Sequence, residues 1–194
     1  MNQKAEQKQR SYEAILASAS SLLRERGIRG SSVMDVMKGA GLTVGGFYGH
    51  FDSKEHLFTE TIRSAAQAMW KGLVATAKGD TPEEKAVSVI RRYLSRKHRD
   101  HPELGCPLPS IAPEVAREGD PYRGALEGEL VAFVKLFSDL LEPDEARHEK
   151  ALAVIAMMYG ALSLSRAVGG SQLSDEFLRA ARKFGEAIVK NEAT

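Results

Sequence analysis

The chain has 194 residues, of which 43% are hydrophobic and 27% are charged, and its mean hydropathy is −0.29. These values are ordinary for a globular protein and exclude an intrinsically disordered chain. The formal net charge is +1, but residues 1–54 hold eight Lys and Arg against five Asp and Glu, a net +3, so the N-terminal end is the basic one.

Three features bear on the compartment. A single cysteine excludes an internal disulfide, and the first residues are too polar for a secretory signal peptide. The longest apolar stretch, residues 151–164, is too short to span a bilayer. We therefore expect a cytoplasmic protein that is not embedded in a membrane.

Helical periodicity runs through almost the whole chain, and no segment alternates apolar and polar residues as a strand does. This pattern predicts an all-α fold. The first helix is expected at 7–26, and Ser32 with Asp35 has the spacing of an N-terminal cap that opens a short helix ending near residue 40. Gly41 permits a tight turn, after which Thr43 can cap a second short helix reaching about residue 50. Further helices are expected at 53–77, 82–98, 108–118, 121–141, 144–168 and 174–191.

Residues 32–51 are predicted to form two short helices joined by a glycine-bearing turn. Their apolar side chains can pack both helices against the first one: Val33, Val36, Met37, Leu42, Phe47 and Phe51. In a helix-turn-helix unit the second helix is held clear of the core and enters the major groove, where the base edges differ chemically. Two short helices with a glycine turn also fit a plain helical hairpin, so the particular residues must decide.

The segment GLTVGGFYGHFDSKEHLF at residues 41–58 resembles the recognition-helix signature of the TetR/AcrR family of regulators. The resemblance reaches upstream to Ile15 and covers about the first sixty residues, while the rest of the chain fits the family only in size and helical layout. It implies an N-terminal three-helix DNA-binding domain at residues 1–54. A larger helical ligand-binding and dimerisation domain would then occupy residues 55–194.

The function implied by the resemblance is that of a ligand-responsive DNA-binding transcriptional regulator. Repression is the simpler direction, because a protein that blocks polymerase needs no further contact, although an activator would have the same DNA-binding head. A repressor of this kind would be released from a palindromic operator by a small hydrophobic or electrophilic inducer.

The resemblance also implies which residues meet DNA. Thr43 and Val44 begin the reading helix, where a hydroxyl and an apolar surface can contact base edges. Tyr48 and His50 match positions that bond backbone phosphates, which sets register without reading sequence. The expected DNA-binding residues are Ser32, Thr43, Val44, Gly45, Gly46, Tyr48, His50 and Lys54. The glycines weaken this helix by about 1 kcal/mol each, but they let its backbone approach DNA closely. The alternative is that Tyr48 and its aromatic neighbours form only a core.

Residues 151–164 are apolar around the whole helix, which calls for burial on both sides. In the family, the last two helices of each subunit form a four-helix dimer interface. The expected interface residues are Ala156, Gly160, Ser163, Phe177, Ala181 and Phe184. A palindromic operator requires such a homodimer, because two recognition helices must reach successive major grooves. A buried central helix of a monomer is the alternative.

A sensor of small molecules needs an apolar cavity with a few polar groups. The candidates that could line one between the middle helices are Trp70, Tyr93, Cys106, Phe133, Phe137, Met157, Met158 and Arg166. Such side chains are often only core. Cys106 is either a small buried hydrophobe or a sensor of electrophiles and oxidants.

Enzyme signatures are absent from the sequence: it has no nucleophile elbow, phosphate-binding glycine loop, clustered Cys/His set or HExxH pattern. We expect no catalytic activity, no cofactor and no metal. His98, His101 and Glu103 have loose metal-ligand spacing, but Pro102 and the expected helix end favour a solvated terminus. The expected partners are double-stranded operator DNA, a second copy of the chain and an inducer. An enzyme and a helical adaptor are the rival classes, and salt-dependent binding to a near-palindrome would separate a regulator from an adaptor.

Overall fold

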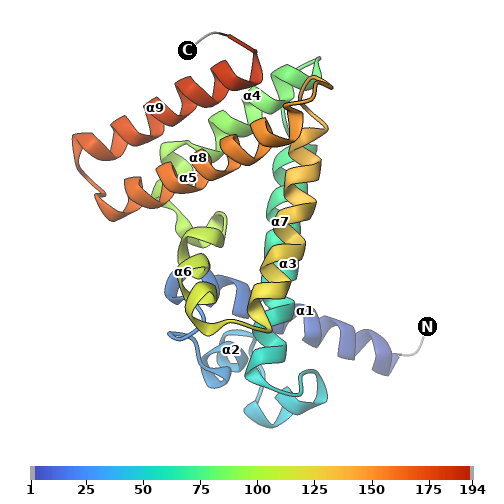
Figure 1. The fold of residues 1–194 in the computed structure, drawn as a ribbon. Helices are drawn as coiled ribbons and strands as arrows, with labels where there is room; N and C mark the ends of the chain where they lie inside the picture. The colour runs from blue at the N-terminus through green and yellow to red at the C-terminus, as the bar shows by residue number, and fades with distance from the viewer. Residues whose placement is uncertain (1–2, 193–194) are drawn as a thin grey trace. The chain divides into compact units, whose positions relative to one another are not determined.

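The computed structural model describes residues 3–192. All regular elements in that range are helical, which confirms the predicted all-α fold class (Figure 1). The chain forms two compact units. The first unit comprises residues 1–66 and 106–128, and the second comprises residues 67–105 and 129–194. The domain boundary expected at residue 54 follows the DNA-binding motif rather than these packing units, and it stays a prediction.

The first unit begins with α1 (Gln3–Arg26), α2 (Val33–Gly39) and the 3₁₀ helix η1 (Val44–Gly49), followed by the first part of α3 (Lys54–Ala75). A later segment completes it, because α6 (Leu108–Glu118) packs on α1. The core of this unit includes fully buried apolar side chains from α1, α2, η1, α3 and the segment between η1 and α3, namely Ile15, Ala19, Leu23, Val36, Met37, Phe47, Phe51, Leu57, Phe58 and Ile62. The helix predicted at 108–118 is therefore confirmed, with a packing role in the N-terminal unit.

Local chemistry explains the two short helices. The hydroxyl of Ser32 accepts a hydrogen bond from the Asp35 amide at 3.0 Å, which confirms the predicted cap of α2. Gly41 has φ +70°, as the tight turn requires. The predicted cap at Thr43 is wrong, because its side chain makes no capping bond and η1 is a 3₁₀ helix. Half of the η1 sequence VGGFYG is glycine, which disfavours an extended α-helix.

The second unit contains α4 (Pro82–Tyr93), α5 (Arg96–Asp100), the 3₁₀ helix η2 (Pro102–Leu104), α8 (Arg147–Ala167) and α9 (Gln172–Val189), with the last part of α7 (Tyr122–Ser138). Figure 1 shows α8 and α9 side by side, and α4 also packs on α9. One predicted helix, at 82–98, is in fact two. Ser95 starts a new helix by accepting a hydrogen bond from the His98 amide at 3.1 Å.

Arginine side chains tie the helices of the second unit together. Arg91 of α4 binds both carboxylate oxygens of Glu186 of α9 at 2.7 Å. Arg96 and Arg99 of α5 both bond to Asp175, near the start of α9. These ion pairs fix α4 and α5 against α9, so α9 is the common support of this unit.

His98 is buried, so the solvated terminus expected there is wrong for this residue. Its Nδ1 lies 2.6 Å from the Tyr93 carbonyl, and the two rings meet edge to face at 4.7 Å. Burial lowers the pKa of His98 to about 4, which keeps the ring uncharged near neutral pH. Within residues 3–192 no cluster of His, Cys, Asp and Glu is suited to hold a metal ion.

Candidate nucleic-acid interface

Residues 43–49 have one anchored side and one solvent-facing side. Phe47 is 1% exposed, whereas Val44 and Tyr48 are 47% and 75% exposed. Thr43, Gly45 and Gly46 are exposed as well. The predicted reading residues of this segment therefore face solvent together, and Tyr48 is not part of an aromatic core.

The anchored side is an aromatic stack. The rings of Phe47 and Phe51 lie 5.8 Å apart, and Tyr12 of α1 stacks on Phe51 at 5.2 Å with an interplanar angle of 17°. Such pairs add to the burial of apolar area. This packing holds the glycine-rich η1 in place, in keeping with the expectation that Phe47 and Phe51 pack this short helix against the first one.

The remaining predicted DNA-binding residues, His50, Ser32 and Lys54, differ in their burial and in their contacts. His50 is half-buried, and its Nδ1 has no hydrogen-bond partner among the described residues. The Ser32 hydroxyl donates to the Asp35 carboxylate at 2.7 Å while accepting from the Asp35 amide, and this contact holds the pKa of Asp35 below its usual value. Lys54 places its ammonium group 5.6 Å from the centre of the Phe58 ring. The Ser32 hydroxyl is thus already engaged within the chain, whereas the Tyr48 side chain is exposed.

The turn between α1 and α2 is held by a carboxylate from α6. Glu114 accepts hydrogen bonds from the amides of Ile28, at 2.5 Å, and Arg29, at 3.3 Å. Gly27, with φ +71°, makes room for it, because a β-carbon at this position would lie 2.6 Å from a carboxylate oxygen of Glu114. The sequence predicted the end of the first helix at residue 26 but gave no indication of Glu114 as a partner of the turn that follows.

Two further contacts reinforce the grip of α6 on α1. The hydroxyl of Ser110 donates to the Arg24 carbonyl at 2.6 Å, which satisfies one of the last carbonyls of α1. Glu118, one turn beyond Glu114, pairs with Arg29. The orientation of the helix-turn-helix therefore depends on side chains that lie far along the chain.

The predicted sensor residues are only partly brought together. Trp70 stacks on Phe133 with ring centres 4.8 Å apart, and Phe137 lies 6.4 Å from Phe133. Tyr93 pairs with His98, as described above, and Met158 is buried. The aromatic trio Trp70, Phe133 and Phe137 is hereafter called the tryptophan cluster.

Three other predicted sensor residues have different surroundings. Arg166 donates to the backbone carbonyls of His98 and Arg99. Met157 lines a groove between α8 and α9 rather than the core. Cys106 belongs to the first unit and is 1% exposed.

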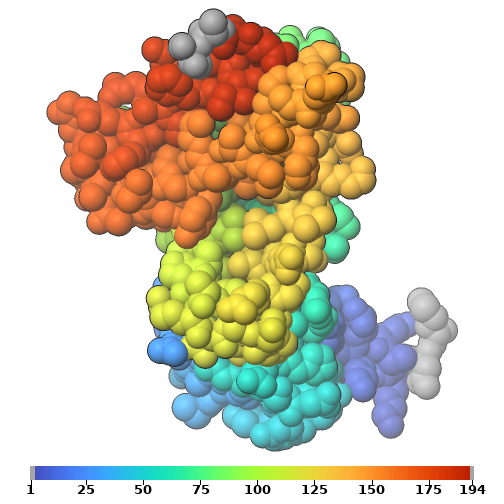
Figure 2. Space-filling view, viewed as in Figure 1, coloured from blue at the N-terminus to red at the C-terminus, as the bar shows by residue number. Residues whose placement is uncertain are grey.

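The outer face of α8 and α9 is apolar and exposed. It contains a groove of about 380 Å³ lined by Met157, Gly160, Ala161, Leu164, Phe177, Ala180, Ala181 and Phe184. Leu164 and Phe184 are 49% and 46% exposed. Helices α8 and α9 are orange and red in Figure 2. Four predicted interface residues line the groove, Ala156 is exposed on the same helix, and Ser163 is half-buried with its hydroxyl bonded to the Tyr159 carbonyl.

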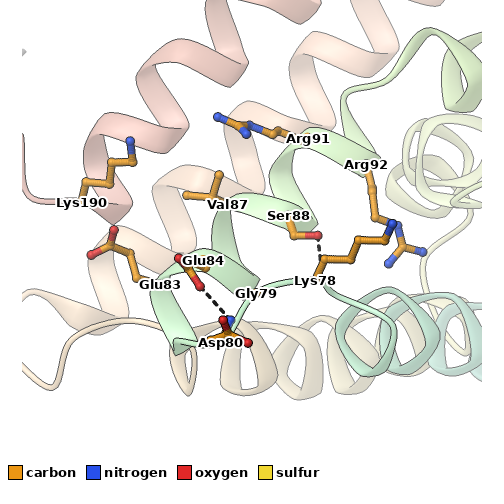
Figure 3. A pocket seen from close by; sticks show the side chains of 10 residues that line it. All are labelled: Lys78, Gly79, Asp80, Glu83, Glu84, Val87, Ser88, Arg91, Arg92 and Lys190. Carbon is orange, nitrogen blue, oxygen red and sulfur yellow. Dashed lines mark hydrogen bonds between the residues drawn. The ribbon is translucent and has the colours of Figure 1, made fainter.

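A larger cavity of about 1030 Å³ lies where the loop before α4 meets α4 and the end of α9, and it was not expected from the sequence. Figure 3 shows Lys190 and Glu83 at one end and Lys78 and Arg92 at the other. Its lining combines four basic with three acidic side chains. Several of its groups already stabilise the chain: Glu84 accepts from the amides of Asp80 and Thr81, and Ser88 accepts from the Lys78 amide.

The short helix η1 is exposed on one side, follows α2 after a tight turn, and is held in place by buried aromatic residues. This arrangement defines a helix-turn-helix DNA-binding protein. The sequence profile described as bacterial regulatory proteins of the tetR family matches residues 15–61, so this N-terminal part of the chain is a DNA-binding domain of that family. The chain is a DNA-binding transcriptional regulator.

Relatives of known sequence agree with this assignment. An HTH-type transcriptional regulator of Mycobacterium tuberculosis is 27% identical over 165 residues, which cover 79% of this chain and 83% of the relative. The HTH-type transcriptional repressor KstR2 of Rhodococcus jostii is 43% identical over 49 residues, but these cover only 25% of this chain and 24% of the repressor.

Solved structures share the fold over nearly the full length. The reduced form of Escherichia coli NemR has a TM-score of 0.78 at 19% identity, covering 92% of this chain and 97% of NemR. A TetR-family regulator from Rhodococcus sp. has a TM-score of 0.73 at 17% identity, covering 93% and 99% of the two chains. In residues 3–192 we find no helix with the length and apolar character needed to cross a bilayer.

Proposed function

We propose that this chain is a repressor that binds a palindromic operator as a homodimer and is released by a small hydrophobic or electrophilic inducer. The observation that carries the proposal is the exposure of Thr43, Val44, Gly45, Gly46 and Tyr48 on a segment anchored by Phe47. Thr43 and Val44 would read base edges, while Tyr48 and Lys54 would bond phosphates.

Gly45 offers a sharp test of DNA contact. A β-carbon there would meet nothing within 4 Å, so Gly45→Ala should fold normally. If the η1 backbone lies against DNA, the added methyl group should weaken operator binding by about tenfold or more. Gly124→Ala on α7, where a β-carbon also meets nothing, is the matched control and should bind as the unmodified chain does.

The assay is a gel shift with the DNA that flanks the chain's own gene, or with fragments selected from a random pool. Tyr48→Phe should weaken binding to all sequences about equally, whereas changes at Thr43 or Val44 should alter which sequence is preferred. Unaltered binding of both Gly45→Ala and Tyr48→Phe would exclude η1 as the DNA-contacting segment.

The homodimer is proposed to form through the outer face of α8 and α9. Two copies of this groove would bury the exposed parts of Leu164 and Phe184, and small side chains such as Gly160 would let the helices approach closely. Phe184→Glu should yield monomers in sedimentation and abolish operator binding. Val131→Glu, at a more exposed apolar position on α7, is the control and should remain dimeric.

The inducer is proposed to contact the tryptophan cluster, with Tyr93, Met157, Met158 and Arg166 as further candidates. Binding of the inducer would release DNA only if the inducer has different affinities for two arrangements of the dimer that differ in how the two η1 segments are placed. Adding an inducer to the operator complex in the gel shift should therefore free the DNA.

An electrophilic inducer would instead act on Cys106. Burial lowers the pKa of Arg24, and the charge of Cys106 opposes that shift, so the thiol and the guanidinium are electrostatic neighbours. The thiolate is the form of cysteine that attacks electrophiles. The sulfur would bond to a ring carbon of a quinone, the proton of the thiol would end on one quinone oxygen, and the hydrogen of the attacked carbon would move to the other oxygen, so that the product is a thioether-bearing hydroquinone. If Cys106→Ser left the release of operator by quinones unchanged, this route would be discarded.

A further inference from the structure

Trp70 carries a buried hydrogen-bond donor that has no acceptor among the residues that the structure describes. The side chain is 1% exposed, and its Nε1 has no partner among the described residues. Two other buried polar side chains of the second unit are bonded: the Ser165 hydroxyl donates to the Leu162 carbonyl, and the Ser174 hydroxyl donates to the Ser165 carbonyl. The Ser138 hydroxyl also has no partner among the described residues, but a hydroxyl can accept as well as donate, whereas the indole N–H can only donate.

An unused donor at this place is unfavourable for the folded chain. An indole N–H can only donate, and burying it without an acceptor forfeits the hydrogen bond that it makes to water in the unfolded chain. Phe133 stacks on the indole ring at 4.8 Å, and this contact requires only an aromatic face. A phenylalanine at position 70 would offer such a face without the unsatisfied group, so the stacking alone does not account for a tryptophan.

We propose that the indole N–H of Trp70 donates a hydrogen bond to the inducer, which is therefore an uncharged aromatic or alicyclic molecule carrying a carbonyl or ether oxygen. This inference rests on the proposed ligand response. The rings of Phe133 and Phe137 make the surroundings apolar, which suits a hydrophobic body and disfavours a charged group without a partner. A hydrocarbon of the same shape would leave the N–H unsatisfied and bind more weakly.

The chain contains a single tryptophan, so one indole resonance in a nitrogen–proton NMR spectrum reports on this donor alone. The full-length protein is titrated with two matched pairs of probes, indanone with indane and tetralone with tetralin. The ketones should move the indole resonance downfield and bind about tenfold more tightly than the hydrocarbons, the expected effect of one satisfied hydrogen bond. The hydrocarbons should not move it downfield.

Two variants separate the hydrogen bond from packing. Trp70→Phe keeps an aromatic ring and removes the donor, so calorimetry should show the preference for ketones falling to about twofold or less while hydrocarbon affinity changes little. Ser138→Ala is the matched control, because it removes the other buried side-chain group of the second unit without a partner, a hydroxyl at the end of α7. It should retain the ketone preference.

Three results would overturn the proposal: no binding of either ketone, a ketone preference that persists in Trp70→Phe, or an indole proton already hydrogen-bonded and protected from exchange in the unliganded protein. These binding measurements involve no DNA. If the ketones bind through Trp70 but leave the operator complex intact in the gel shift, the proposed induction fails and the ligand chemistry stands.

Discussion

Two glycines with the same backbone conformation provide a quantitative test of how α6 holds the helix-turn-helix. Gly27 and Gly41 have φ +71° and +70°, in the left-handed region. A β-carbon at position 41 would meet nothing within 4 Å, whereas one at position 27 would lie 2.6 Å from the carboxylate of Glu114. Alanine at either position therefore introduces the same strain, and only alanine at position 27 displaces Glu114.

The difference in stability can be worked out from these contacts. Left-handed backbone strain costs about 1–2 kcal/mol for an alanine. Displacing Glu114 also breaks its bonds to the amides of Ile28 and Arg29, and hydrogen bonds to charged groups contribute about 1.5–3 kcal/mol. We expect Gly41→Ala to lower the free energy of unfolding by about 1–2 kcal/mol. Gly27→Ala should lower it by about 2.5–5 kcal/mol, the sum of this strain and one hydrogen bond to a charged group, because the longer bond to Arg29 is exposed and adds little.

Urea denaturation of the full chain measures both values. In a Glu114→Ala background the clash is already gone, so adding Gly27→Ala should cost only about 1–2 kcal/mol. Equal losses for the two single glycine variants would refute the reasoning. So would strictly additive losses for Gly27→Ala and Glu114→Ala, because residues in direct contact should be coupled.

Three further predictions concern the second unit. The pKa of His98 is about 4 in the folded chain against about 6.5 when unfolded, so the unfolded chain takes up a proton that the folded chain does not as pH falls through this window. The free energy of unfolding should therefore fall by up to about 3 kcal/mol between pH 6.5 and pH 4 in urea titrations. His98→Gln should flatten this pH dependence, whereas the control His148→Gln, at an exposed position, should not. An unchanged slope in His98→Gln would contradict the prediction. The Arg91 guanidinium holds the pKa of Glu186 below its usual value, so its stabilisation is present above about pH 4.3 and is lost at lower pH. Glu186→Gln should therefore lower the melting temperature at pH 7 and make its acid-side decline shallower, and an equally steep decline would count against this ion pair. A β-carbon at Gly185 would lie 3.5 Å from the Cδ1 atom of Ile90, an ordinary van der Waals contact, so Gly185→Ala should raise the free energy of unfolding by about 0.5–1 kcal/mol. A decrease would show that α9 is more tightly packed than these distances indicate.

Features set by neighbouring residues were the ones that sequence reasoning predicted well. The Ser32 cap, the Gly41 turn and the anchoring of η1 by Phe47 depend on spacings of a few residues, and all three are present. The break before α5 was missed, because Ser95 lies within a continuous helical pattern and its capping bond to the His98 amide becomes evident only in three dimensions.

Long-range partners were not predictable from the sequence. Glu114 bonds to the amide of Ile28 across 86 positions of the chain, and nothing in its local pattern distinguishes it from other glutamates on helices. The adjacent Met157 and Met158 illustrate a second limit. When a helix is apolar on all sides, its sequence does not indicate which side faces the core. Only the structure shows that Met157 lines the outer groove while Met158 is buried.

The participation of α6 in the first unit matters for anyone who builds chimeric regulators from this chain. A graft that exchanges only residues 1–54 would separate the amides of Ile28 and Arg29 from Glu114, and would leave the Arg24 carbonyl without Ser110. A transplanted DNA-binding head should therefore carry residues 106–128 from the same parent, or their counterparts matched at both acceptor and donor positions.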